Sequence, residues 1–426
     1  MKQRVFIIDH ELISPIAIGK QNIIESIQSN FSADRFITRT DVSGVPFKKA
    51  AEVQQDLHSF FKDESDHFKA VCEIDRKLEL LAACYGLMKD RVEDLVKKFD
   101  ESKTGVILGI GAEAPPYEFF EKELKVFLHQ RYNSINELMV SLNRGGGKLN
   151  FMNNPYDVYA LYLAQKMNAG AFQKSILTAC VSSTQAIALA YDSIARSQAE
   201  VVISGGTDSI INLAAMMSFG KLGVIAETDD RISCRPFDVN RFGTVAGEAA
   251  GIVLLASENF VLKHKLQPFA QLTGYGNTLD GYKITAPDPS GISIERALKN
   301  AIVNSAITSS VIDYINAHGT GTKQNDEIEL NAIRNVMGEY ANSVPVSSTK
   351  DRHGHAIAAA GIQELCLLLE FMKHDLMPGN LNLQNPINAD MNLLRENTSK
   401  KIKYALTSNF AFGGINTVLA VKNELL

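Results

Sequence analysis

The sequence has few cysteines, and no two of them form a Cys-x-x-Cys pair. Their number is odd and they are widely scattered, at positions 72, 84, 180, 234 and 366. We therefore expect neither a disulfide framework nor a cysteine-based zinc site. The pattern favours a reduced, cytosolic compartment, because disulfides persist mainly in oxidising ones.

Long apolar runs and an excess of positive charge are also missing. The first apolar run, Val5–Ile8, is ended by Asp9 and is too short for a signal peptide, and no later run is long enough to cross a bilayer. Lysine and arginine number 43 against 48 aspartates and glutamates, which gives a net charge of −5. This balance is not that of a nucleic-acid-binding domain. We expect a cytoplasmic protein without a membrane span.

What the sequence does contain is a series of short apolar runs that lead through small-residue loops into helix-like segments. Such runs predict buried strands in an α/β fold. They lie at residues 5–8, 104–109, 175–178, 201–206, 251–255, 312–317, 344–347, 404–407 and 418–421.

A more polar segment, Ser257–Pro268, divides the 426 residues into a longer and a shorter part. A chain of this length is expected to hold two or three domains, or two halves around one core. Because both parts alternate strands and helices, we predict an internal duplication with domains at 1–256 and 257–426. Residues 115–155 are expected to form an irregular insert with a helix of its own.

Two glycine motifs resemble nucleotide-binding loops only superficially. Residues 109–114 fit the G-x-G-x-x-G/A dinucleotide fingerprint, but Pro115 and Pro116 follow where a helix would have to begin. Residues 145–148, Gly-Gly-Gly-Lys, lack the spacing of a P-loop. We interpret both segments as loops.

Cys180 follows the third apolar run, and a helix with a small-residue face is expected directly after it. A thiol at a helix N-terminus meets unpaired N–H groups and the positive end of the helix dipole, which favour the nucleophilic thiolate. From this feature alone, a nucleophile and a small buried core cysteine are equally good interpretations. The other four cysteines are interpreted as core residues.

Two histidines and one turn add to the case for a nucleophile. His318 stands where an apolar run becomes a loop of glycine and threonine, which a substrate can approach closely. His355 lies near the start of a long apolar helix expected at 356–372, whose dipole helps keep the imidazole neutral. The turn at 408–416 offers backbone N–H groups for half of an oxyanion hole, and the N–H of Cys180 offers the other half. All three side chains lie at strand-to-loop exits, the usual location of α/β active sites.

Four ordered motifs resemble those of the elongating β-ketoacyl-acyl-carrier-protein synthases, which are condensing enzymes of the thiolase fold. The motifs are Thr-Ala-Cys at 178–180, Asn-Ala-His-Gly-Thr-Gly-Thr at 316–322, Ser-Thr-Lys-x-x-x-Gly-His at 348–355 and Asn-Phe-Ala-Phe-Gly-Gly-Ile-Asn at 409–416. Segments 235–238 and 247–251 also look like family signatures, so the resemblance covers nearly the whole chain. It implies a duplicated five-layer α-β-α-β-α architecture and a dimer joined through a sheet edge.

The resemblance also implies a role for each motif residue. Cys180 would take an acyl chain from a carrier protein's phosphopantetheine thioester. His318 and His355, donating from Nε2, would stabilise the malonyl thioester oxygen during loss of CO₂, and the N–H groups of Cys180 and Phe412 would hold the oxyanion of acyl transfer. The remaining matches are Lys350 with an electrostatic or structural role, Thr320 and Thr322 at the pantetheine arm, and the organising residues Asp326, Glu329, Glu364 and Asn416. No metal and no cofactor beyond the carrier's arm is implied, and for Lys350 a surface lysine is the alternative.

Several departures from the family pattern bear on the substrate. An acidic, proline-rich segment, Ala112–Pro116 with Glu113, replaces a usual glycine run near the acyl pocket. Ala411 replaces a common glycine, and Lys283 stands where a histidine is frequent. These departures leave fatty-acid elongation and a specialised pathway (polyketide, aryl polyene or pigment) equally open.

The main alternative function is a catalytically idle subunit, similar to a chain-length factor, that binds carrier protein and a ketosynthase partner. The presence of Cys180 argues against it, because such paralogues usually lack the nucleophile. A Cys-His hydrolase is a third, weaker hypothesis. The expected partners are an acyl carrier protein and a second subunit, either identical or paralogous, with Arg76 and Lys77 as candidate carrier-docking residues.

Overall fold

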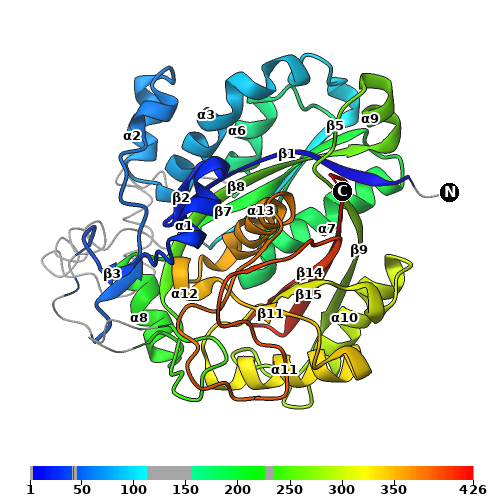
Figure 1. The fold of residues 1–426 in the computed structure, drawn as a ribbon. Helices are drawn as coiled ribbons and strands as arrows, with labels where there is room; N and C mark the ends of the chain where they lie inside the picture. Colours follow the sequence, from blue (N-terminus) through cyan, green and yellow to red (C-terminus); the bar gives the residue numbers. More distant parts are fainter. Residues whose placement is uncertain (1–2, 41, 43–45, 113–155, 227–233, 426) are drawn as a thin grey trace, which may run out of the picture.

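The computed structural model describes residues 3–40, 42, 46–112, 156–226 and 234–425 (Figure 1). The predicted insert at 115–155, with the loop at 145–148, lies outside the described residues, and so does Glu113.

Ten strands form the main path of one large sheet, which consists of two similar sets of five. The first set, in spatial order, is β1 (Val5–Ser14), β8 (Ala246–Ser257), β7 (Val201–Ser209), β5 (Thr104–Ile110) and β6 (Phe172–Ile176). The second set is β9 (Ala270–Leu279), β15 (Ile415–Asn423), β14 (Tyr404–Phe410), β10 (Tyr314–Asn316) and β11 (Val346–Ser347).

Both sets have the same topology. Numbered along the chain within its own set, each has the spatial order first, fifth, fourth, second, third. In each set the last three strands of this order are parallel, and the first two pair antiparallel. The sets meet where Val5–Ile7 of β1 pairs with β9. This repetition is the structural signature of a duplicated α/β unit.

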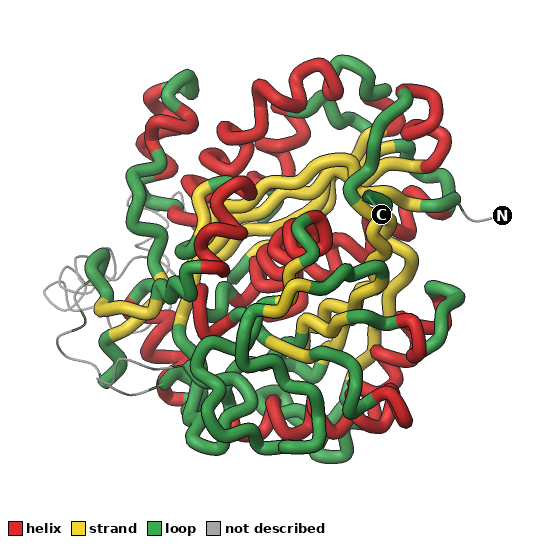
Figure 2. The backbone as a smooth tube through the Cα atoms, in the orientation of Figure 1, coloured by secondary structure: helices red, strands yellow, loops and turns green. Residues whose placement is uncertain are grey.

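Helices complete five layers. The first strand set carries α3 (Arg76–Val96) and α6 (Val158–Lys166) on its outer face, and the second carries α10 (Ile292–Asn304) and α11 (Lys323–Met337). Between the two strand layers lie α7 (Ser182–Ala195) and α13 (Ala360–Lys373) (Figures 1 and 2).

The two central helices pack closely, which explains one glycine. A Cβ at Gly361 on α13 would lie 1.9 Å from Oγ1 of Thr184 on α7, so any side chain there would push the helices apart.

Shorter elements occupy the edges of these layers. They are β2 (Ala17–Ile18), α1 (Ile23–Gln28), β3 (Asp34–Phe36), β4 (Lys49–Ala51), α2 (Asp66–Cys72), α8 (Leu213–Lys221), α9 (Glu258–His264), α12 (Lys350–His353), β12 (Leu376–Met377) and β13 (Thr398–Ser399). The helix α9 separates the two strand sets, and the domain boundary at 256/257 stays a prediction.

Each predicted apolar run overlaps a strand, but the sequence did not reveal β9. Its burial alternates along the strand and its sequence contains two glycines, so no continuous apolar run marks it. The strand β1 is also longer than predicted, because its charged residues are buried in pairs: Asp9 contacts Lys20 and Arg91, and His10 lies 3.0 Å from Glu370.

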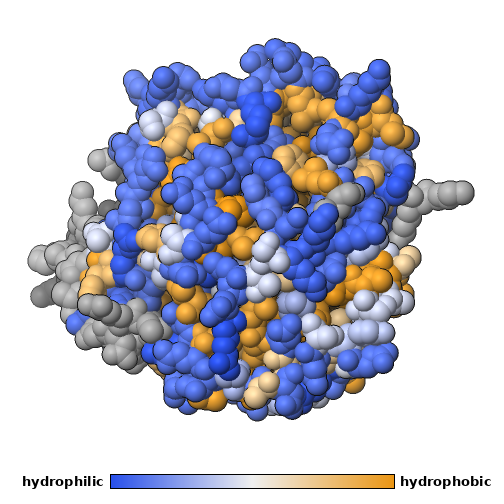
Figure 3. Space-filling model, in the orientation of Figure 1, coloured by the Kyte–Doolittle hydropathy of each residue, from blue (hydrophilic) through white to orange (hydrophobic). Residues whose placement is uncertain are grey.

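No helix in the described ranges has the length and apolar character needed to cross a membrane. The face of the molecule drawn in Figure 3 is mainly hydrophilic, with hydrophobic patches between the polar areas.

Candidate active site

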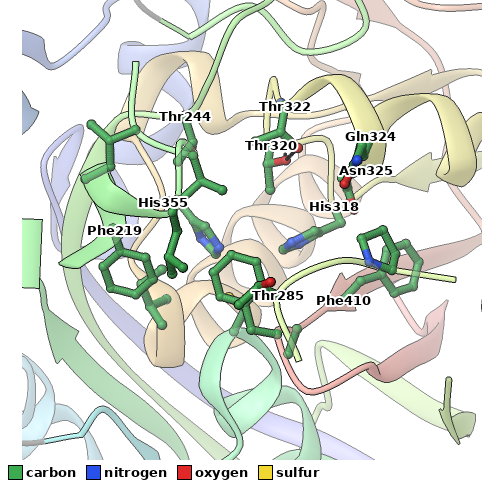
Figure 4. Close-up of a pocket in the computed structure, with 18 of the residues that line it drawn as sticks. Phe219, Thr244, Thr285, His318, Thr320, Thr322, Gln324, Asn325, His355 and Phe410 are labelled. Atoms are coloured by element: carbon green, nitrogen blue, oxygen red, sulfur yellow. Dashed lines mark hydrogen bonds between the residues drawn. The ribbon is translucent and has the colours of Figure 1, made fainter. Parts of the chain in front are cut away.

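Three side chains from distant parts of the sequence line one cavity of about 520 Å³: Cys180, His318 and His355. In Figure 4 the two imidazole rings point toward one another across the cavity. Their centroids are 5.2 Å apart and the rings are nearly perpendicular. The structure thus brings together the nucleophile and the two histidines that the sequence singled out.

A tight turn positions Cys180. The chain leaves β6 at Ile176, forms a single 3₁₀ turn over Ala179–Val181, and enters α7 at Ser182. The Ser182 hydroxyl donates to the Ala179 carbonyl at 2.8 Å and accepts from the Thr178 N–H at 2.9 Å, which fixes the turn.

The backbone N–H groups of Cys180 and Phe412 lie near enough to the Cys180 sulfur to lower its pKa. They come from the two segments that the sequence analysis assigned to an oxyanion hole. Donors beside the sulfur are what the oxyanion of acyl transfer would require.

The prediction that this position favours the thiolate is wrong for the cavity without a ligand. Burial raises the pKa of Cys180 to about 12, although the Lys350 charge and the N–H groups of Phe412 and Cys180 oppose that rise. The cost of removing a thiolate from water exceeds the benefit of the turn and the nearby cation. Cys180 is therefore a neutral thiol near pH 7, and any nucleophilic role needs loss of its proton during reaction.

Both histidines are held in place through their backbone. The N–H groups of His318 and Gly319 donate to the two Glu329 carboxyl oxygens at 2.7 and 2.8 Å, and the N–H of His355 donates to the Val245 carbonyl at 2.7 Å. Burial, aided by the Lys350 charge, holds the pKa of each ring well below its usual value. The rings are thus neutral near pH 7.

His355 is kept neutral mainly by burial and not by the helix dipole expected from the sequence. The helix expected at 356–372 is a 3₁₀ turn at Ile357–Ala359 followed by α13 from Ala360. His355 lies outside both elements, and burial is the largest influence on its pKa, followed by the charge of Lys350.

Lys350 is fully buried, so the surface-lysine alternative is wrong. Its ammonium forms an ion pair with Glu364, whose second oxygen accepts from Asn409 at 2.7 Å. The same ammonium donates to the His318 carbonyl at 2.5 Å and lies 3.4 Å from His318 Nδ1. Because an ammonium only donates, His318 Nδ1 is an acceptor and the proton of the neutral ring is on Nε2.

The remaining acidic residues organise the loop that carries His318. Asp326 accepts from the N–H groups of Phe237 at 2.8 Å and Gly321 at 3.2 Å. Burial raises the pKa of Glu329 to about 8, even though two backbone N–H groups oppose this rise. Both carboxyl groups lie on α11 and hold the loop against that helix.

The predicted threonines and asparagine lie on the cavity wall. Thr320 and Thr322 line it with their hydroxyl oxygens 2.9 Å apart. Asn416 also lines it and donates to Asp280 at 2.7 Å.

Arg76 and Lys77 are not free for carrier docking. Arg76 is paired with Glu248, at 2.8 Å, and with Glu79, at 2.6 Å, and little of its side chain is exposed. Lys77 is buried, with its ammonium over the Tyr159 ring. The Arg76 charge is thus satisfied within this half of the fold, and Lys77 is part of its packed interior.

Sequence reasoning missed much of the cavity wall. The additional wall residues include Ile210, Phe219, Leu222, Val224, Ile225, Phe242, Thr244, Thr285, Ile357 and Phe410. Most lie between motifs, in segments that read only as ordinary apolar sequence, so one sequence without its fold offered no signal for them.

Comparison with known proteins identifies the family. The chain matches the beta-ketoacyl synthase, N-terminal domain over residues 2–260 and the beta-ketoacyl synthase, C-terminal domain over residues 269–384. It belongs to the beta-ketoacyl synthase family.

Similar curated proteins include two kinds of relative. Nodulation protein E of Rhizobium meliloti is 34% identical over 252 residues, which are 58% of this chain and 61% of the relative. The match thus spans about six tenths of that relative's length. The 3-oxoacyl-[acyl-carrier-protein] synthase 2 of Synechocystis sp. (strain ATCC 27184 / PCC 6803 / Kazusa) is 27% identical over 99% of this chain and 98% of its own.

Solved structures share the fold. A type II PKS acyl-carrier protein in complex with its ketosynthase, bound to the hexaketide, contains a chain that matches with a TM-score of 0.85 and 23% identity over 99% of this chain and 100% of its own. A ketosynthase in complex with its chain length factor from Xenorhabdus doucetiae matches with a TM-score of 0.75 and 23% identity, over 99% and 98%. The predicted thiolase-like, duplicated five-layer fold is confirmed.

Proposed function

We propose that this chain catalyses a decarboxylative Claisen condensation between an acyl group held on Cys180 and a malonyl-carrier protein, yielding a 3-oxoacyl-carrier protein. The observation that carries this proposal is the single cavity lined by Cys180, His318 and His355. The two N–H groups near the sulfur support it.

In the first step the Cys180 sulfur attacks the thioester carbonyl of an acyl-carrier. The carrier's thiol leaves, taking up the proton that Cys180 gives up, and the acyl chain remains on the sulfur as a new thioester. The N–H groups of Cys180 and Phe412 stabilise the negative oxygen of the tetrahedral intermediate. Losing one such donor typically costs on the order of 10²–10³ in rate.

In the second step the malonyl-carrier loses CO₂, and the electron pair moves onto its thioester oxygen as an enolate. Neutral His318 donates to that oxygen from Nε2, the atom that carries its proton because Lys350 faces Nδ1. His355 is the second donor. The enolate carbon then attacks the acyl-cysteine carbonyl, and the sulfur leaves and is reprotonated. This chemistry needs no cofactor beyond the carrier's own phosphopantetheine arm.

Intact-protein mass spectrometry after incubation with an acyl-carrier thioester tests the proposal. We expect an acyl adduct that peptide mapping places on Cys180 and that disappears when malonyl-carrier is added. The Cys180→Ala variant should show no adduct. The Cys72→Ala variant is the matched control, because Cys72 is equally buried but lies on α2, outside the cavity wall, and should keep the adduct.

The second candidate function is a catalytically idle subunit that shapes a ketosynthase partner. One observation favours it: burial leaves the Cys180 thiol protonated. This candidate predicts no adduct with any acyl-carrier, together with a stable complex with a paralogous ketosynthase.

We further propose that the chain binds an acyl carrier protein and pairs with a second subunit through the β6 edge. Among the described strands β6 pairs only with β5, and its central residues Gln173 and Lys174 are exposed. Native mass spectrometry would distinguish a homodimer from a heterodimer with a paralogue. The five cysteines are all unpaired and buried, which fits the reducing cytoplasm that we propose as its compartment.

A further inference from the structure

Thr244 lines the cavity, and its buried hydroxyl has no hydrogen-bond partner in the described part of the chain. The residue is 6% exposed, its Oγ1 atom is buried, and it lines the cavity beside His355 (Figure 4). Buried hydroxyl groups are normally hydrogen-bonded, because an unmet donor or acceptor costs free energy. The Thr244 hydroxyl therefore has an unmet hydrogen-bonding capacity, because no described group of the surrounding protein pairs with it.

The backbone around Thr244 is fixed on both sides. Its N–H donates to the Val224 carbonyl and its carbonyl accepts from the Ala226 N–H, both at 2.8 Å. The next carbonyl along the chain, that of Val245, accepts from the N–H of His355 at 2.7 Å. The same short segment therefore places Thr244 and the imidazole of His355. Because Oγ1 is buried within the wall, contact with a ligand requires rotation about the Thr244 Cα–Cβ bond.

Few polar groups of the described wall lie on this side; one of them is His355, whose Nδ1 atom also lacks a hydrogen-bond partner. On this side the cavity is lined mainly by the apolar side chains Phe219, Leu222, Val224, Ile225 and Ile357. In the proposed reaction the thioester oxygens already have donors, namely two backbone N–H groups and two imidazole Nε2 groups. The next polar atom along such a substrate is an oxygen on carbon 3.

We propose that the Thr244 hydroxyl donates a hydrogen bond to an oxygen on carbon 3 of a bound acyl thioester, which makes Thr244 a specificity-determining residue. The inference rests on the proposed function. Two substrates carry such an oxygen: the malonyl donor, as its carboxylate, and an unreduced primer, as its 3-oxo group. In either case this wall favours oxygenated acyl groups over saturated ones.

The test uses the full chain and two half-reactions. The first is transfer of saturated and 3-oxo primers of equal length from their carriers to Cys180, followed by mass spectrometry. The second is release of CO₂ from malonyl-carrier. Thr244→Val removes the hydroxyl at nearly constant volume and Thr244→Ser retains it, while Thr273→Val removes a hydroxyl that lies outside the cavity wall and donates to the Ala420 carbonyl.

If the primer is the partner, Thr244→Val lowers the 3-oxo to saturated transfer ratio about fivefold to tenfold, the effect of one hydrogen bond. If the malonyl donor is the partner, CO₂ release falls by that factor and the primer ratio stays at the wild-type value. In both cases the Thr244→Ser variant gives values close to wild type, and the Thr273→Val control leaves the transfer ratio and the rate of CO₂ release unchanged. The inference is overturned if Thr244→Val changes neither quantity, whereas a wild-type chain that forms no adduct overturns the proposed function itself.

Discussion

The two central helices begin with the same turn but carry different chemistry. In each half a single 3₁₀ turn precedes a 14-residue helix, and the helix starts three residues after the first residue of the turn. That first residue has positive φ in both halves, 50° at Ala179 and 39° at Ile357. By this correspondence the structural counterpart of Cys180 is Ala358.

This difference shows which side chains each half of the duplicated fold contributes to the one site. The first half supplies a sulfur, placed by a turn and its backbone N–H groups. The second half has no reactive side chain at the equivalent place, and instead carries most of its polar side chains upstream of the turn, with Glu364 on the helix after it. It holds both histidines, the buried lysine and the acidic residues Asp326, Glu329 and Glu364. The nucleophile is thus positioned by one half, and its electrostatic environment is set mainly by the other.

The largest effect is expected from moving the sulfur between the equivalent turns. Cys180→Ala should lower condensation by at least about 10³-fold, as loss of a nucleophile does in other enzymes. Adding Ala358→Cys to that variant should restore nothing, because Ala358 does not line the cavity. Steady-state assays with acyl-carrier and malonyl-carrier measure both. Recovery in the double variant would mean that the two turns are functionally interchangeable.

A large effect on stability is expected from Lys350, the cation of the second half. Lys350→Met leaves the Glu364 carboxylate buried without its partner, and breaking a buried ion pair in this way costs about 3–5 kcal/mol. Denaturant unfolding should show this loss. The Lys350→Met/Glu364→Gln double variant should recover part of it, because the unpaired charge is gone; a double variant no more stable than the single one would contradict the ion-pair explanation.

The sequence was informative where chemistry requires particular residues in a particular order. The motifs around positions 180, 318, 355 and 412 led to the site, and the apolar runs led to most strands of the sheet. These features can be recognised from local sequence alone, and the interpretation of each one is unchanged once the fold brings them together.

The sequence was uninformative or misleading wherever burial determines the protonation state or the accessibility of a side chain. It could not show that the Cys180 thiol loses more from desolvation than it gains from the turn, that Arg76 is paired with Glu248, or that Lys77 is buried. It also missed β9, whose alternating pattern is visible only once its neighbours are known. Each of these depends on what surrounds a residue in space, which one sequence does not state.

A further test of burial uses the pH dependence of Cys180 alkylation by iodoacetamide. Only the thiolate reacts, and its fraction rises tenfold per pH unit below the pKa. With the pKa raised to about 12, the rate should climb with slope near one from pH 7 to 10 and show no plateau. The reaction of an ordinary cysteine thiol, with a pKa of about 8.5, would level off in that range. Lys350→Met removes a charge that lowers the Cys180 pKa, so its rates should be lower still at every pH.

The smallest effects concern the strained first residues of the two turns, and they should have opposite signs. Ala179 is exposed, so Ala179→Gly relieves positive φ at little cost in packing and should raise the free energy of unfolding by up to about 1 kcal/mol. Ile357 is buried against the cavity, so Ile357→Gly gains the same relief but loses an apolar side chain worth about 2–5 kcal/mol, and should destabilise. Denaturant unfolding of both variants measures the pair. Equal changes in the free energy of unfolding would mean that backbone strain alone determines the stability of the two turns. Changes of opposite sign would mean that the packing of Ile357 in the cavity wall outweighs the backbone strain at that residue.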